Sequence, residues 1–286
     1  MKKIESIMHK LLETVRERRA KRLLSEILGR QSVAGFPVFL IKGINHIQSL
    51  KKINDFSLKY LNGEWICHIE GLNFVINSTE ELLIVEEVFI NGVYNVEINH
   101  PFVFIDIGMN VGITSLFFAN KPDCKKVIAF EPFQPTLAHA RKNFKKNGIS
   151  CKIQVNEVGL GYPSRTLTIN YSEEWKGSVG IDGVASYIEK KKDIREEQLP
   201  IIDVFEALND IADEKIILKI DCEGSEYEIL ERLNDTGLLP RFDVIMIEWH
   251  IKGAAPLRKI LHDNNFDILS MGEHSLNIGM LYAFKK

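Results

Sequence analysis

The sequence has few cysteines and no long apolar run, and both absences exclude classes of protein. Its 286 residues include four cysteines, and no pair of them has C-x-x-C spacing. A disulfide framework and a structural zinc site are therefore not expected. No apolar run reaches the roughly 18 residues of a membrane span, and the basic N-terminus lacks the apolar core of a signal peptide. We expect a cytoplasmic protein with no transmembrane segment.

The chain also lacks a strong charge of either sign. The formal net charge of −3 provides no general attraction to nucleic acid or to an anionic membrane. No Asn/Asp-Pro-Pro-Tyr element and no patch that mixes aromatic and basic residues is present, so a nucleic-acid partner is not expected. The composition, 45% hydrophobic and 26% charged, is typical of a soluble globular protein with one large or two modest domains.

The first 85 residues are expected to form a region of their own. Apolar residues at helical spacing predict a helix over residues 1–29, and alternation on both sides of Glu70-Gly71 predicts short strands. Residues 1–30 carry nine Lys/Arg against four Asp/Glu. Such a helix can contact a lipid surface, a partner or the acceptor, although a solvated helix packed by its apolar side is more usual.

From residue 102 onward, apolar runs alternate with amphipathic segments, which predicts an α/β fold over residues 86–286. Strands are expected at 102–107, 126–131, 151–157, 215–221, 243–248, 266–271 and 279–285. Helices are expected at 111–120, 134–147, 202–210, 226–235 and 254–265. The last two strands are too close for a helical crossover, so the seven-stranded, mostly parallel, Rossmann-like sheet should have one antiparallel strand. Between the third and fourth strands, 167–171 and 179–182 suggest a hairpin or lid.

A glycine turn after the first of these strands points to a nucleoside ligand. The run Val103-Phe-Ile-Asp-Ile-Gly-Met-Asn-Val-Gly112 reads as a strand, a tight turn and a helix start, and a second strand then ends in Glu131. Glycine lets the backbone approach a ligand and take positive φ. Glu131 is placed to accept hydrogen bonds from both hydroxyls of a ribose.

The turn differs from a dinucleotide site. Its pattern is D-x-G-x-N-x-G, with Asp106 in the strand end and Asn110 where a second glycine would be needed. A pyrophosphate on the helix N-terminus is disfavoured beside a carboxylate. A ligand with an ammonium group and no phosphate would suit Asp106, and S-adenosylmethionine is such a ligand. The turn alone would also suit an ordinary α/β protein.

In an open α/β sheet the ligand lies beyond the carboxyl ends of the strands. Those ends supply the candidate cofactor contacts Asp106, Gly108, Met109, Asn110, Gly112, Glu131, Pro132, Asn156, Glu157 and Asp221. Asn156 or Glu157 would accept a hydrogen bond from the amino group of the adenine ring. For Glu157, an equal alternative is that it is a solvated loop residue with no role in binding.

Five titratable residues lie at or just beyond the ends of the fourth and fifth predicted strands. They are the candidate catalytic residues Asp221, Glu223, Glu226, Glu248 and His250. Since these two strands should be neighbours, the acids would converge, and clustered carboxylates require a cation among them. The alternatives for this cation are the ammonium or sulfonium group of S-adenosylmethionine, a divalent metal ion, and protonated His250. His250 or one of the acids would act as general base, whereas Glu226 could merely begin a helix.

These motifs resemble those of the FkbM family of class I S-adenosylmethionine-dependent methyltransferases. The matching segments are Phe104–Ile113, Ala129–Pro132, Ile201–Leu208 and Leu218-Lys-Ile-Asp-Cys-Glu-Gly-Ser-Glu226. The resemblance implies the class I methyltransferase fold and O-methylation of a hydroxyl on a carbohydrate, glycolipid or secondary metabolite. It also implies cofactor contacts from Asp106, Gly108, Asn110, Gly112 and Glu131, with Asp221 and Glu223 facing the methyl group and the acceptor.

Two other functions are compatible with parts of the sequence. One is a donor-binding but catalytically inactive scaffold that contacts partners through the basic N-terminal helix. The other is an NAD-dependent oxidoreductase, which Asp106 and Asn110 disfavour. The sequence identifies neither the acceptor nor the oligomeric state.

Overall fold

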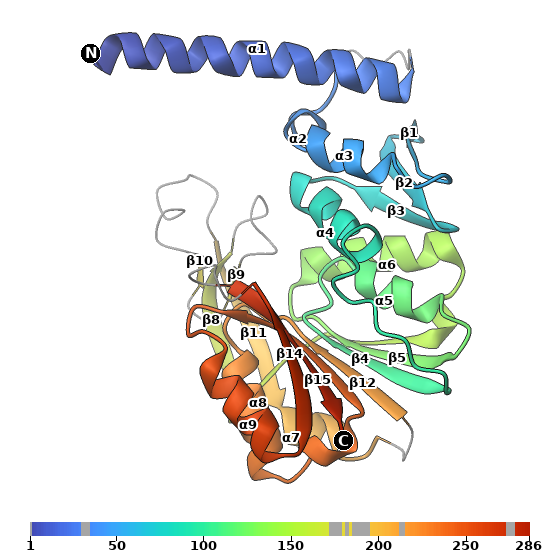
Figure 1. Cartoon of the computed structure of the whole chain (residues 1–286), viewed down its shortest axis with the longest axis vertical. Coiled ribbons are helices and arrows are strands. Elements are labelled where there is room, and N and C mark those ends of the chain that lie inside the picture. The colour runs from blue at the N-terminus through green and yellow to red at the C-terminus, as the bar shows by residue number, and fades with distance from the viewer. Residues whose placement is uncertain are drawn as a thin grey trace. The chain divides into compact units, whose positions relative to one another are not determined.

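The computed structural model describes residues 2–29, 35–171, 179–180, 183–184, 195–211, 215–272 and 278–286 (Figure 1). The chain divides into two compact units, Met1–Asn95 and Val96–Lys286. This division falls after the boundary expected at residue 85, because helix α4 runs without a break over Thr79–Phe89.

The N-terminal unit combines helices with a small antiparallel sheet. Its helices are α1 (Lys2–Leu28), α2 (Val38–Lys42), α3 (Ile44–Leu50) and α4. Its strands are β1 (Ser57–Leu61), β2 (Glu64–Ile69) and β3 (Leu72–Ile76). The expected turn at Glu70-Gly71 joins β2 to β3, and both residues have positive φ (48° and 77°), as a two-residue hairpin requires.

The C-terminal unit is built on a seven-stranded sheet with the order β14-β15-β13-β12-β4-β5-β6. The strands are β4 (Phe102–Ile107), β5 (Cys124–Phe130), β6 (Ile153–Asn156), β12 (Lys215–Ile220), β13 (Val244–His250), β14 (Phe266–Met271) and β15 (Ile278–Lys285). Only β15 runs against its neighbours β13 and β14, which confirms the predicted Rossmann-like class I methyltransferase fold and its terminal antiparallel hairpin. All seven predicted strands are present, with ends that differ by a few residues.

Alternating residues of the sheet strands face two different layers. Ile105 of β4 and Leu218 of β12 belong to a core shared with α8 (Glu226–Asp235) and α9 (Ala255–Asp263). On the other face, the ring of Phe104 stacks on that of Phe118 in α5 (Ile113–Ala119), with centroids 3.7 Å apart. Asp106, Lys219, Glu248 and His250 lie at alternating positions that share the face of Phe104, outside the α8 and α9 core.

The segment between β6 and β12 differs from the predicted hairpin. Strand β8 (Arg165–Tyr171) pairs with β11 (Arg195–Asp203) and not with Val179–Gly180, and β11 also pairs with β7 (Gly159–Gly161). Val179–Gly180 instead forms β9 and pairs with β10 (Gly183–Val184), while residues 181–182 lie outside the described residues. Because β11 continues to Asp203, helix α7 (Val204–Leu208) is shorter than the predicted 202–210. Asp203 caps this helix by accepting from the N–H of Phe205.

Two helices of the C-terminal unit have the predicted bounds: α6 covers Gln134–Asn147 and α8 covers Glu226–Asp235. Gly148 ends α6 in the left-handed conformation, as its position after a lysine-rich turn predicts. Within the described ranges, the helices include none with both the length and the apolar character needed to cross a membrane.

Candidate functional site

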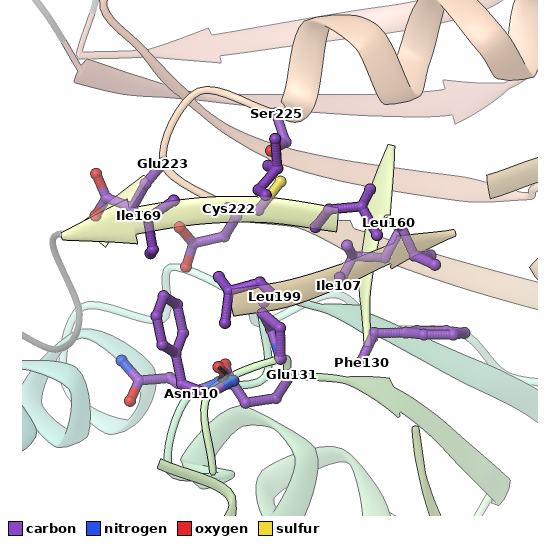
Figure 2. A pocket seen from close by; sticks show the side chains of 17 residues that line it. Ile107, Asn110, Phe130, Glu131, Leu160, Ile169, Leu199, Cys222, Glu223 and Ser225 are labelled. Atoms are coloured by element: carbon purple, nitrogen blue, oxygen red, sulfur yellow. Dashed lines mark hydrogen bonds between the residues drawn. The ribbon is translucent and has the colours of Figure 1, made fainter. Parts of the chain in front are cut away.

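A pocket opens at the carboxyl ends of β4, β5 and β12 (Figure 2). The chain runs from β4 outward to β5 and β6 and then returns to β12 on the other side of β4, so the strand order reverses here. Ligands of open α/β sheets bind at such a reversal. The expected site residues among those that line the pocket are Gly108, Asn110, Glu131, Pro132, Asp221 and Glu223.

The glycine turn is fixed by its neighbouring strand. A Cβ on Gly108 would lie 1.7 Å from the backbone oxygen of Asp221, and Gly108 has a φ of 79°. The need for glycine here therefore comes from close packing against the loop after β12, a reason different from approach to a ligand. Gly112 has a φ of 78° at the start of α5, and a Cβ there would meet the ring of Phe144.

Glu131 and Asn110 join the two strand ends. Asn110, at a φ of 53°, donates its backbone N–H to Oε2 of Glu131 over 3.0 Å. The N–H of Phe133 donates to Oε1, also over 3.0 Å. Burial raises the pKa of Glu131 to about 7, although these two N–H groups favour the charged form. Each carboxylate oxygen keeps further acceptor capacity, and the Glu131 side chain borders the pocket (Figure 2).

Asp106 lies below the pocket and does not line it. Its side chain is fully buried, accepts from the Ser115 hydroxyl over 2.7 Å and lies 3.0 Å from Nζ of Lys219. Lys219 also donates to the backbone oxygen of Gly108 over 2.9 Å and lies 3.4 Å from the Asp221 carboxylate. Burial alone would lower the pKa of Lys219, but Asp106 and Asp221 raise it above its ordinary value.

Lys219 is a site residue that the sequence interpretation missed. The signal was available, since Lys219 is the one charged residue inside the otherwise apolar run Ile216–Ile220. A buried lysine needs a buried carboxylate partner, and the register places Asp106 of β4 directly opposite.

Besides Asp106, four predicted cofactor residues do not line this pocket: Gly112, Met109, Asn156 and Glu157. Met109 is 2% exposed, and its backbone N–H donates to the Phe130 oxygen over 3.0 Å. Asn156 donates its side-chain amide to the Ala129 oxygen over 3.2 Å. Glu157 is exposed, accepts from Gln134 over 2.8 Å and forms an ion pair with Arg141. Their predicted contacts with the donor remain predictions.

The acids after β12 and Glu248 within β13 converge with His250. The imidazole Nε2 of His250 lies 3.7 Å from Glu223 and 3.8 Å from Glu248, and its Nδ1 lies 3.3 Å from Glu226. Glu226 is fully buried and accepts from the backbone N–H groups of His250 (2.6 Å) and Gly224 (2.7 Å). Burial alone would lower the pKa of His250, but the hydrogen bond to Glu226 and the charges of Glu223 and Asp221 raise it to about 9.

Apolar side chains of the β7–β11–β8 sheet form a second wall of the pocket. They belong to Leu160, Leu167, Ile169, Leu199 and Ile201. Figure 2 shows Leu160, Ile169 and Leu199 on the strands of this sheet, beside the cavity that Asn110 and Glu131 also line. Alternation at Leu167 and Ile169, and again at Leu199 and Ile201, was visible in the sequence but did not indicate that these residues face a ligand.

The residues present fit S-adenosylmethionine. Glu131 is a buried carboxylate whose oxygens are already oriented by two backbone N–H groups, as the ribose hydroxyls require. The apolar wall suits a purine ring, and Asp221 and Glu223 supply negative charge for a cationic group.

Comparisons with known proteins agree with this geometry. A family model for the methyltransferase FkbM domain matches residues 106–268. Methyltransferase sdnD of Sordaria araneosa is 24% identical over 230 residues, which cover 68% of this chain and 85% of that protein. The 31-O-demethyl-FK506 methyltransferase FkbM of Streptomyces tacrolimicus is 26% identical over 226 residues, which cover 69% and 83%.

Among solved structures, the methyltransferase FkbM from Methylobacillus flagellatus matches with a TM-score of 0.44 and 14% identity. That match covers 96% of this chain and 60% of the other. The family match extends over more than half of the sequence and includes the glycine turn, Glu131, the acids after β12 and Glu248 in β13. The chain therefore belongs to the FkbM family and is a methyltransferase.

Proposed function

We propose that the protein is an S-adenosylmethionine-dependent O-methyltransferase whose acceptor is a hydroxyl of a carbohydrate, glycolipid or secondary metabolite. The observation that carries the proposal is that Glu131, oriented by Asn110 and Phe133, lines the same pocket as Asp221 and Glu223. A nucleoside-binding acid and a group of acids suited to proton transfer are thus present in one cavity. The O-demethyl substrate named for the Streptomyces relative supports oxygen as the methylated atom.

Glu131, Asn110 and Pro132 would hold the nucleoside end of the donor, and the apolar wall would cover its base. Asp221 would face the ammonium or sulfonium charge. Glu131 is ionised above a pH of about 7 and then accepts from both ribose hydroxyls. When bound, S-adenosylmethionine supplies a methyl group attached to a sulfonium sulfur. Transfer of the methyl group to the acceptor oxygen leaves that sulfur as a neutral thioether, and the acceptor hydroxyl loses one proton.

Glu223 is the residue we propose to receive that proton. Its carboxylate lines the pocket in which the acceptor hydroxyl would lie. Glu226 would act through another group, because it is fully buried and holds both the backbone and the ring of His250. A positioned base contributes about 10²–10⁴-fold to a rate.

The proposal is tested by incubating the protein with methyl-labelled donor and with separate glycan, lipid and small-molecule fractions. Label should enter one fraction as an alkali-stable methyl ether, identified by its methoxy carbon resonance. Label found only on nitrogen or carbon, or no transfer to any fraction, would contradict O-methylation.

A pair of variants then tests the site. Glu223→Gln should lower turnover by about 10²-fold or more while it leaves the affinity for S-adenosylhomocysteine within about twofold. Glu231→Gln is the matched control, because Glu231 is an exposed acid on α8. Equal turnover in the two variants would remove Glu223 from the mechanism.

A further inference from the structure

Asp221, Glu248 and His250 converge at the carboxyl ends of two adjacent strands. The register pairs Ile220 of β12 with Ile247 of β13, so the next positions, Asp221 and Glu248, are neighbours. His250 follows two residues after Glu248, and alternate residues of a strand share a face. One ligand atom from each of the three side chains lies within 4.8 Å of the other two.

Glu226 fixes the orientation of the His250 ring. The His250 side chain is 8% exposed, and Nδ1 is 3.3 Å from the buried carboxylate of Glu226. That contact directs Nε2 towards Glu248 and Glu223, at 3.8 Å and 3.7 Å. Both distances exceed the range of a hydrogen bond, and no hydrogen bond to Nε2 is present within the part of the chain that the structure describes. A carboxylate that holds one imidazole nitrogen while the other is directed at acids is the arrangement of metal-binding histidines.

The carboxylates around His250 also favour a bound cation. Five carboxylates gather here, those of Asp106, Asp221, Glu223, Glu226 and Glu248. Lys219 is the lysine in contact with them, but its Nζ is engaged by Asp106 at 3.0 Å and by the Gly108 oxygen at 2.9 Å. Its nearest approach to the remaining acids is 3.4 Å, to Asp221. Carboxylates this close to one another favour a cation between them.

We propose that Asp221, Glu248 and His250 bind one divalent first-row transition-metal ion, with Mn²⁺ as the probe. One imidazole and two carboxylates suit such an ion better than Mg²⁺, which prefers oxygen ligands and retains its waters. The inference rests on the proposed function and deepens it. Because Asp221 also lines the pocket, an ion held by it borders the space where the acceptor hydroxyl must lie. The ion would bind that oxygen and make its proton easier to transfer to Glu223.

Direct binding to the purified full chain tests the site without any variant. After treatment with a chelator and its removal, the chain should bind one Mn²⁺ by titration calorimetry, more tightly than it binds Mg²⁺. The electron paramagnetic resonance spectrum of the bound ion should show coupling to one imidazole nitrogen. No Mn²⁺ binding, or binding without nitrogen coupling, would overturn the proposal.

Variants assign the ligands. Asp221→Asn and His250→Gln should each weaken Mn²⁺ binding by about 100-fold or more, and Glu226→Gln, which leaves the ligands in place, by roughly 10-fold. Glu231→Gln should bind Mn²⁺ as the wild type does. Affinity for S-adenosylhomocysteine in Glu226→Gln and His250→Gln verifies that these variants are folded. Unchanged Mn²⁺ binding in folded His250→Gln would contradict the assignment.

The experiments distinguish failure of the metal site from failure of the proposed O-methyltransferase function. Methyl transfer to a hydroxyl that persists unchanged in chelated protein, with no Mn²⁺ bound, would remove the metal site and leave the O-methyltransferase proposal intact. Mn²⁺ binding that depends on Asp221 and His250, without label uptake by any hydroxyl, would retain the site and remove the proposed function.

Discussion

The backbone N–H of Asn110 donates a hydrogen bond of 3.0 Å to Oε2 of Glu131. This bond connects the glycine turn after β4 with the acid after β5, two positions 21 residues apart in the chain. It sets the direction of the carboxylate before any ligand arrives. Preorganisation of this kind lowers the entropic cost of binding, because the side chain does not need to be ordered again.

The first prediction concerns Glu131→Gln. Loss of the charged acceptor should weaken S-adenosylhomocysteine binding by roughly 10- to 100-fold, since hydrogen bonds to a charged group contribute about 1.5–3 kcal/mol. Titration calorimetry measures the change, and Glu231→Gln on the surface of α8 provides the matched control. If both variants bind the product equally well, the ribose contact assigned to Glu131 is wrong.

The second prediction is a pH dependence of donor binding. With its pKa raised to about 7 by burial, Glu131 is largely neutral at low pH, beside the fixed Asp106 and Lys219 pair. Affinity for S-adenosylhomocysteine should therefore rise by about tenfold or more between about pH 5.5 and pH 8.5. The profile of Glu131→Gln should be flat over that range, and an equally steep profile in the variant would assign the titration to another group.

The raised pKa of Glu131 also affects the free energy of unfolding, which should fall with rising pH whereas donor affinity should rise. Because the folded pKa of Glu131 lies above its ordinary value of 4.5, its stabilising contribution is present at acid pH and is lost as pH rises through about 7. In the ligand-free protein, the wild type should lose free energy of unfolding relative to Glu131→Gln as pH increases from about 5 to about 8. Urea denaturation at several pH values measures the difference, and a constant difference would contradict the assigned pKa.

The third prediction concerns Lys219→Met. The substitution leaves Asp106, which is fully buried, without its cationic partner, so the free energy of unfolding should fall by about 3–5 kcal/mol. Adding Asp106→Asn should restore part of this loss, because the unpaired charge is removed. A double-mutant cycle by urea denaturation measures the coupling. Independent, additive losses would show that the two side chains do not stabilise each other.

The fourth prediction compares two glycines with similar φ. Gly148 has a φ of 66° and open space where a Cβ would lie, whereas a Cβ on Gly108 would overlap the Asp221 oxygen. Gly148→Ala should cost only the strain of the left-handed conformation, about 1–2 kcal/mol. Gly108→Ala should cost at least about 2 kcal/mol more and should also weaken S-adenosylhomocysteine binding, since the loop at Asp221 must move. Thermal unfolding and calorimetry provide both values.

Local patterns were sufficient for much of the fold. The helices over 134–147 and 226–235 follow from their amphipathic spacing and end signals, and the short link before the last strand predicts its antiparallel pairing. The positions of Glu131 and Asp221 at strand ends also follow from the sequence, because the ends of parallel strands meet at one edge.

Other features depend on pairing that is distant in the sequence. Asp106 ends a strand as predicted, yet its charge is directed to Lys219, 113 residues later in the chain. Strand β11 contains Pro200 and a charged run, so it has a weak strand pattern on its own, and pairing with both β7 and β8 stabilises it. A local interpretation of residues 202–210 as helix could not include those partners.

The β7–β11–β8 wall belongs to one stretch of chain inserted between β6 and β12. The carboxylates and the glycine turn, by contrast, come from the strands of the central sheet. One cavity is thus lined by two separate parts of the C-terminal unit. Replacing the inserted sheet would therefore remove the apolar side chains proposed to cover the base of the donor, while the two backbone hydrogen bonds that orient Glu131 would remain.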